Sequence, residues 1–232
     1  MSRRIYALNN TGIKSLQSGF FSEAICSFRM AVECLNADLY LCSYHNSSQT
    51  TTTTTTTTEY LDELRTAPID VTCTDSTTIL EASPHNTFDV YQMSFAFPKM
   101  TSMASLRTEL SVVLFYNLAL AHHLAGLAGV EEAERHLRQA EKFYKIGITI
   151  FKNTPALRVD TNCCAMVLGM LTNLGHVFTH FFNFKDAASC RTHMQEILQS
   201  AAIMGLSDED GEFFYSALTY SQAHDAVAAP AA

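Results

Sequence analysis

The chain has little glycine and proline, and it lacks the excess of basic residues that nucleic-acid binding requires. Its 232 residues include nine glycines and five prolines, too few for a collagen-like or extended chain. Acidic residues outnumber basic ones by 23 to 15, which gives a formal net charge of −8. Because binding to nucleic acid normally needs a basic face, we expect no nucleic-acid partner.

Signals for export and for membrane insertion are also missing. No apolar run follows the basic N-terminal cluster MSRRI, so we expect no secretory signal peptide. No segment approaches the roughly 18 uninterrupted apolar residues that a membrane span needs, so we expect no membrane association. These absences predict an intracellular protein, either cytoplasmic or nuclear.

Cysteine is present, but not in a metal-binding or redox pattern. The seven cysteines include no C-x-x-C pair, and their odd number without a signal peptide predicts reduced thiols. We interpret them as small core hydrophobic residues. Phosphate loops and dinucleotide-binding fingerprints are absent from the sequence as well. We therefore expect no cofactor and no metal, and nothing places a nucleophile beside a base.

Hydrophobic residues are plentiful, at 47% of the chain, and they recur at the spacing of α-helices. The sequence therefore predicts a mainly α fold. We expect Gly19 to end the first helix and Ser22 to be the N-cap of the second. The predicted helices cover residues 3–18, 22–43, about 105–126 and about 131–152, followed by one that begins at Pro155 and one that ends at Gly205.

Two segments interrupt this helical pattern. Thr50 to Thr58 form an unbroken threonine run without periodicity, which is typical of a solvated low-complexity loop. Residues 88–97 alternate in polarity and are rich in aromatic side chains, a pattern that predicts a strand. We expect this strand to pair with residues 212–220 in a small two-stranded β element. A helix is the alternative at 212–220, because Ser207 and Asp210 have the spacing of a capping box.

The expected organisation follows from these segments. Helical hairpins precede and follow a central non-helical region, and the C-terminal tail is expected to be flexible. The regions are a first hairpin at 1–44, the threonine loop at 45–66, an insertion at 67–104, second and third hairpins with long helices at 105–205, and a C-terminal segment at 206–232.

Three segments of the chain resemble one another. They begin at Asn10, Asn117 and Asn173; in each, a small residue follows two positions later and an acidic residue followed by alanine opens the second helix. These positions resemble the tetratricopeptide repeat (TPR), a helix–turn–helix unit of about 34 residues. The third copy departs at Phe182, which stands where the turn glycine is expected. The resemblance covers about half of the chain, and its structural positions are Gly12, Gly19, Ala24, Phe28, Ala31, Ala133, Gly175 and Ala187.

The resemblance implies an α-solenoid of TPR-like antiparallel hairpins. Gly12 would then lie where the first two helices approach most closely, opposite Ala24, and Gly19 would occupy a left-handed turn. The implied function is a non-catalytic protein-interaction module or scaffold that binds an unknown protein or peptide in a concave helical groove. The groove residues that the match implies are Asn9, Ile13, Tyr116, Leu120, His123, Thr172, His176 and Thr179.

Two alternatives stay open from the sequence. In the first, the insertion folds over the groove and fills it. In the second, the chain is an enzyme or small-ligand-binding protein with a pocket between the helices and the insertion, marked by histidines beside an acidic or cysteine residue. His122 and His123 are adjacent and so face different ways. His176 and His180 are four apart, but Val177 stands where the zinc-protease pattern needs glutamate.

Overall fold

The computed structural model of the chain describes residues 3–46, 66–67, 89–97, 106–129, 131–154, 161–201 and 206–228. Within these ranges the protein is mainly helical, as the sequence predicted. It forms seven helices and two strands of two residues each. These elements are α1 (Arg3–Gln17), α2 (Phe21–Asn46), β1 (Thr66–Ala67), β2 (Ser94–Phe95), α3 (Leu106–Leu127), α4 (Ala133–Asn153), α5 (Thr161–His180), α6 (Phe184–Ala201) and α7 (Asp208–Ala228).

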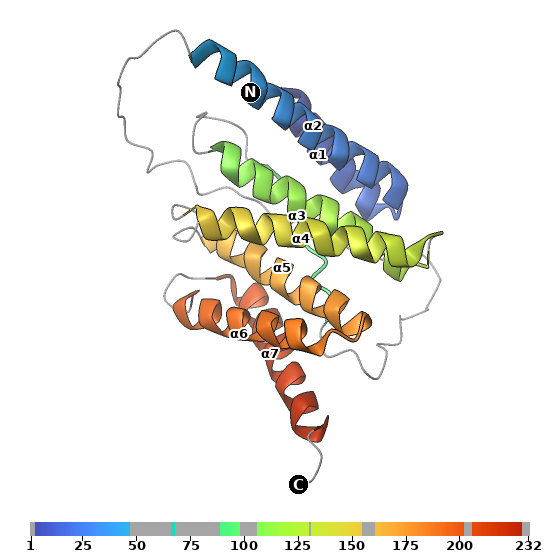
Figure 1. Cartoon of the computed structure of the whole chain (residues 1–232), viewed down its shortest axis with the longest axis vertical. Helices are drawn as coiled ribbons and strands as arrows, with labels where there is room; N and C mark the ends of the chain where they lie inside the picture. The colour runs from blue at the N-terminus through green and yellow to red at the C-terminus, as the bar shows by residue number, and fades with distance from the viewer. Residues whose placement is uncertain are drawn as a thin grey trace.

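Consecutive helices form antiparallel pairs that are stacked along the long axis of the molecule (Figure 1). Helix α1 packs on α2, α3 on α4, and α5 on α6, while α2 also contacts α3 and α4 contacts α5. Helix α7 packs against α5 and α6 at the C-terminal end. The order of the helices in the chain is therefore their order in space, with the two termini at opposite ends of the stack (Figure 1).

The turns within the pairs depend on left-handed backbone. Gly19 has a φ of 74°, so its predicted role in ending α1 is confirmed. Phe182 has a φ of 56° at the corresponding turn after α5, although a bulky residue is disfavoured there. The side chain of Phe182 is 73% exposed, so the turn itself has room for it. Ser22 is not the N-cap of α2, because the Ala24 N–H already bonds the Phe20 carbonyl and the helix starts at Phe21.

The close helix approach predicted at Gly12 is present, but its neighbour is different. A Cβ at Gly12 would lie 2.6 Å from Cε1 of Phe28, because that ring extends from α2 across the backbone of α1. Ala24, the expected neighbour, is buried one turn away on the same face of α2. Among the other repeat positions, Ala31, Gly175 and Ala187 are buried and Ala133 is partly exposed.

The core is centred on α3 and α5. Every residue from 164 to 179 is buried. The stretch Thr108–Leu127 of α3 is long and apolar enough to cross a membrane, contrary to the expectation that none approaches this. However, 78% of that stretch is buried inside the protein, so packing against neighbouring helices accounts for its hydropathy.

The predicted pairing of residues 88–97 with 212–220 is wrong. Strand β2 pairs antiparallel with β1, matching Phe95 to Thr66, and residues 212–220 lie in α7. The capping box decides between helix and strand: the Asp210 N–H donates to Ser207 Oγ at 3.2 Å, and the Ser207 hydroxyl donates to the Asp210 carboxylate at 2.6 Å. Helix α7 continues to Ala228, so most of the C-terminal segment is helical.

Several predictions concern residues outside the described ranges or only partly inside them. The threonine run Thr50–Thr58, the helix start at Pro155 and the helix end at Gly205 lie outside them. The cysteine prediction can be compared at four positions: Cys164 and Cys190 are buried, as expected of core residues, Cys34 is partly buried, and Cys26 is exposed.

Candidate functional site

An extended segment of the chain lies on the face formed by α1, α3 and α5. We call residues 89–97 the inserted segment and this helical face the inner face. The inserted segment contains β2 and is otherwise without regular structure. Its backbone is held by one asparagine from each of the three helices: Asn9 of α1, Asn117 of α3 and Asn173 of α5. These three residues form what we call the asparagine clamp.

Asn173 binds both backbone polar groups of Tyr91. Its Oδ1 accepts the Tyr91 N–H at 2.7 Å, and its Nδ2 donates to the Tyr91 carbonyl at 2.9 Å. A side-chain amide can do this because it presents an acceptor and a donor side by side. The Tyr116 hydroxyl donates a further bond to the same carbonyl at 3.2 Å. The backbone of Tyr91 is therefore fully paired although it is buried.

Asn117 binds Phe95 in the same manner. Its Oδ1 accepts the Phe95 N–H at 3.0 Å, and its Nδ2 donates to the Phe95 carbonyl at 2.8 Å. Asn117 Nδ2 also donates to Asn9 Oδ1 at 2.9 Å, and Asn9 Nδ2 reaches the same carbonyl at 3.2 Å. The two doubly bonded residues, Tyr91 and Phe95, are four positions apart, so successive helices of the inner face hold successive parts of one extended chain.

The aromatic side chains of the inserted segment fill spaces between the helices. Phe95 packs edge-on against Tyr116 with ring centroids 5.0 Å apart, and Tyr91 lies 4.8 Å from Phe214 of α7. Phe97 contacts Tyr6 of α1 at 5.2 Å. These contacts explain the aromatic pattern of residues 88–97 and 212–220: the two segments meet through rings rather than through a β ladder.

The predicted groove residues are buried rather than exposed. Asn9 and Tyr116 contact the inserted segment, and His123 contacts Tyr144. Thr172 is misplaced, because its hydroxyl faces Met194 of α6 and the Leu168 carbonyl. The buried set is Asn9, Ile13, Tyr116, Leu120, His123, Thr172, His176 and Thr179. The structure thus agrees with the alternative in which the insertion fills the groove.

Two of the three clamp residues were missed as site residues. Asn117 and Asn173 were recognised as the first positions of the second and third copies. In the first copy the corresponding contact comes from Asn9 and not from Asn10, which is exposed. The recurrence of asparagine at that position was the signal that could have identified the clamp.

A chain of polar contacts leads from the clamp to a buried histidine pair. Asn173 Nδ2 donates to the Tyr144 hydroxyl at 3.0 Å, and this hydroxyl lies 3.4 Å from Nδ1 of His123. Nε2 of His123 is 3.1 Å from Nδ1 of His176. Burial lowers the pKa of His123 well below its usual range and that of His176 to about 4, so both rings are neutral near pH 7.

The histidine pair contacts a tyrosine rather than a carboxylate or a thiol. Across the ranges that the structure describes, no group of three or more His, Cys, Asp or Glu side chains is placed to hold a metal ion. The chemistry that these contacts support is the positioning of neutral hydrogen-bonding groups in a low-dielectric interior.

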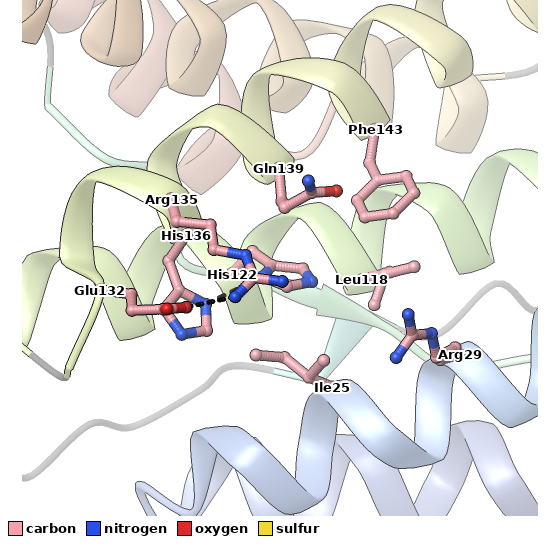
Figure 2. Close-up of a pocket in the computed structure, with 9 residues that line it drawn as sticks. All are labelled: Ile25, Arg29, Leu118, His122, Glu132, Arg135, His136, Gln139 and Phe143. Carbon is pink, nitrogen blue, oxygen red and sulfur yellow. Dashed lines mark hydrogen bonds and ion pairs between the residues drawn. The ribbon is translucent and has the colours of Figure 1, made fainter.

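A separate pocket of about 250 Å³ lies on the opposite side of α3. Figure 2 shows side chains from α2, α3 and α4 directed toward this shared space. Nδ1 of His122 lies 2.9 Å from Nδ1 of His136, and Glu132 is ion-paired with Arg135. The lining residues are Ile25, Arg29, Leu118, His122, Glu132, Arg135, His136, Gln139 and Phe143.

Comparison with known proteins does not identify a family. No protein-family model matches the chain, and no curated protein or solved structure does so either.

Proposed function

We propose that this chain is a non-catalytic protein-interaction module, a TPR-like α-solenoid whose inner face binds an extended peptide. The observation that supports the proposal is the double bonding of one residue's N–H and C=O by Asn117, repeated by Asn173. Main-chain bonds of this kind provide affinity for an extended segment whatever its sequence, whereas pockets for side chains provide specificity.

The specificity of the proposed site follows from what the inserted segment buries. Tyr91, Phe95 and Phe97 are buried, while Gln92 is exposed. A partner peptide would therefore carry aromatic residues at the first, fifth and seventh positions of an extended stretch. Position two, which corresponds to the exposed Gln92, would tolerate variation, whereas position four, which corresponds to the buried Ser94, would need a small residue.

In this conformation the chain's own inserted segment occupies the inner face. A partner must then replace residues 89–97, so the inserted segment acts as an internal competitor. An internal ligand lowers the apparent affinity for a partner by the fraction of molecules in which the face is free. Weakening the inserted segment should thus expose the proposed binding function.

The test adds the segment back in trans. In the 232-residue chain with Tyr91→Ser and Phe95→Ser, a fluorescently labelled peptide of sequence DVYQMSFAF should bind at least tenfold more tightly than it binds the wild type. A control peptide with serine at its three buried aromatic positions should not bind. Adding Asn117→Ala and Asn173→Ala to the double-serine chain should weaken binding at least tenfold, because both backbone bonds at each residue are lost.

A folding control is needed because the two serine substitutions remove buried aromatic rings. If the double-serine chain unfolds on its own, saturating peptide should restore its helical circular dichroism and a cooperative transition. Neither binding nor restoration by the peptide would mean that the inserted segment is a permanent part of the core, and the proposed function would be lost.

A further inference from the structure

The pocket between α2, α3 and α4 is basic in a chain that is acidic overall. Arg29 of α2, His122 of α3, and Arg135 and His136 of α4 line it, and Glu132 is the acidic residue in the lining. Arg29 forms no ion pair with any residue that the structure describes. The formal net charge of the whole chain is −8, so this local gathering of cationic and imidazole groups departs from the general surface.

The imidazoles of His122 and His136 contact each other in this pocket. Their Nδ1 atoms face each other at 2.9 Å, so one ring must donate a hydrogen to the other. Burial, followed by the positive charges of His136, Arg29 and Arg135, lowers the pKa of His122 to about 4. These positive charges disfavour the imidazolium form of His122. A bound anion would oppose that repulsion and favour the imidazolium form.

We propose that this pocket binds a phosphate group, either free phosphate or the monoester of a small molecule. Arginine side chains match phosphate oxygens geometrically and bond them with two N–H groups at once. The volume of about 250 Å³ is below that of sites for drug-sized ligands, which suits a small anion. The pocket also lies beside the first turn of α4, whose positive end adds to the attraction. This site is independent of the function proposed for the inner face.

The acidic residue of the pocket, Glu132, provides a second test of phosphate binding. Its carboxylate is ion-paired with Arg135, one of the two guanidinium groups expected to bind phosphate. Removing that carboxylate frees Arg135 and removes a repelling charge, so Glu132→Gln should tighten phosphate binding. A general surface effect of net charge would instead respond equally to any charge change on α4.

The experiment is a titration of the full chain with inorganic phosphate at constant ionic strength, followed by NMR of the imidazole Cε1 protons. We expect saturable shifts at His122 and His136, with no matching shift at His193, which lies on α6. Arg29→Gln should raise the dissociation constant at least fivefold, and Glu132→Gln should lower it at least twofold. The matched control Arg138→Gln should change it less than twofold, because Arg138 lies over the ring of Phe181, outside the pocket.

A second titration with O-phosphoserine distinguishes the source of the phosphate group. Tighter binding of the ester than of free phosphate identifies a monoester site, and the reverse order identifies a site for free phosphate.

A third titration tests whether His122 takes up a proton on binding, and it uses sulfate because the charge of sulfate is constant from pH 7.5 to 5.5. Sulfate should bind more tightly as pH falls, and this dependence should vanish in His122→Gln. Unsaturable shifts, or equal dissociation constants in Arg29→Gln, Glu132→Gln and Arg138→Gln, would overturn the proposal.

Discussion

Residues of the same type differ in burial and in contacts between the two sides of α3. His123 faces the inner face, is wholly buried and contacts Tyr144 and His176. Its neighbour in sequence, His122, faces the open pocket and contacts His136. The aromatic neighbours divide in the same way: Tyr116 is buried against the inserted segment, whereas Phe115 is only partly buried against Phe143.

This difference separates a closed site from an open one. On the inner side, every polar group of the clamp has a partner within the chain, so a ligand can enter only by replacing the inserted segment. On the pocket side, cationic groups outnumber the acidic one and the space between them is open.

Truncation of Tyr116 should have the largest effect. Tyr116→Ala removes a fully buried ring that packs on Phe95 and a hydroxyl that bonds the Tyr91 carbonyl. We expect it to lower the free energy of unfolding by about 3–5 kcal/mol, the usual cost of truncating a buried aromatic residue. Phe115→Ala, one position earlier, should cost about 1 kcal/mol because Phe115 is partly exposed. Urea unfolding of both variants measures this, and equal losses would contradict the two-sided description.

Acid should destabilise the protein through the inner side. The pKa of His176 is lowered from 6.5 to about 4 by burial, and secondly by the positive charge of His180. Below about pH 6.5 His176 binds a proton in the unfolded chain but stays neutral in the folded protein. The free energy of unfolding is therefore highest above pH 6.5 and falls toward pH 4. The shift corresponds to about 3 kcal/mol.

Urea unfolding at a series of pH values measures that acid sensitivity. In His176→Gln the loss of stability between pH 6.5 and 4 should be smaller by about 3 kcal/mol. An identical pH dependence in this variant and the wild type would show that the buried pair is not its source.

Loss of a clamp amide should have an intermediate effect. Asn117→Ala leaves the buried N–H and C=O of Phe95 without their Asn117 bonds. We expect a loss of about 2 kcal/mol in the free energy of unfolding, the scale of unsatisfied buried polar groups. Gln139→Ala, in the lining of the open pocket, should change stability by less than about 0.5 kcal/mol. Matching losses at the two positions would argue against a special role for the clamp.

The smallest effect is expected on the pocket side. Arg29 is exposed and has no ion pair among the described residues, so Arg29→Gln should leave the free energy of unfolding within about 0.5 kcal/mol of wild type. Thermal unfolding measures this. A loss above about 1 kcal/mol would mean that Arg29 has a structural role in the helix array.

The sequence was sufficient for the helices and for the choice of inner face, because both depend on local spacing. The periodic apolar residues predicted the helices, and the motif match selected Asn9 and Tyr116, which contact the inserted segment. Local spacing could not predict that the inserted segment covers the inner face, because Asn173 bonds a residue 82 positions away. Residues 212–220 were assigned to a strand because aromatic enrichment is shared by strands and by helices that pack on rings. The cap at Ser207 was the better local signal.

The histidines illustrate the same limit at the pocket. Their adjacency predicted that His122 and His123 face different ways, and the structure confirms it. The contact of His122 with His136 depends on how α4 folds back along α3 after the turn at Gly129, which has a φ of 67°. Spacing along one helix contains no information about that cross-helix contact.

Amide hydrogen exchange reports whether the asparagine amides hold the backbone of the inserted segment. In the wild type, the N–H groups of Tyr91 and Phe95 should exchange far more slowly than that of the exposed Gln92. Asn117→Ala should speed exchange at Phe95 at least tenfold while Tyr91 stays protected. Equal, fast exchange at Tyr91, Gln92 and Phe95 in the wild type would contradict the account.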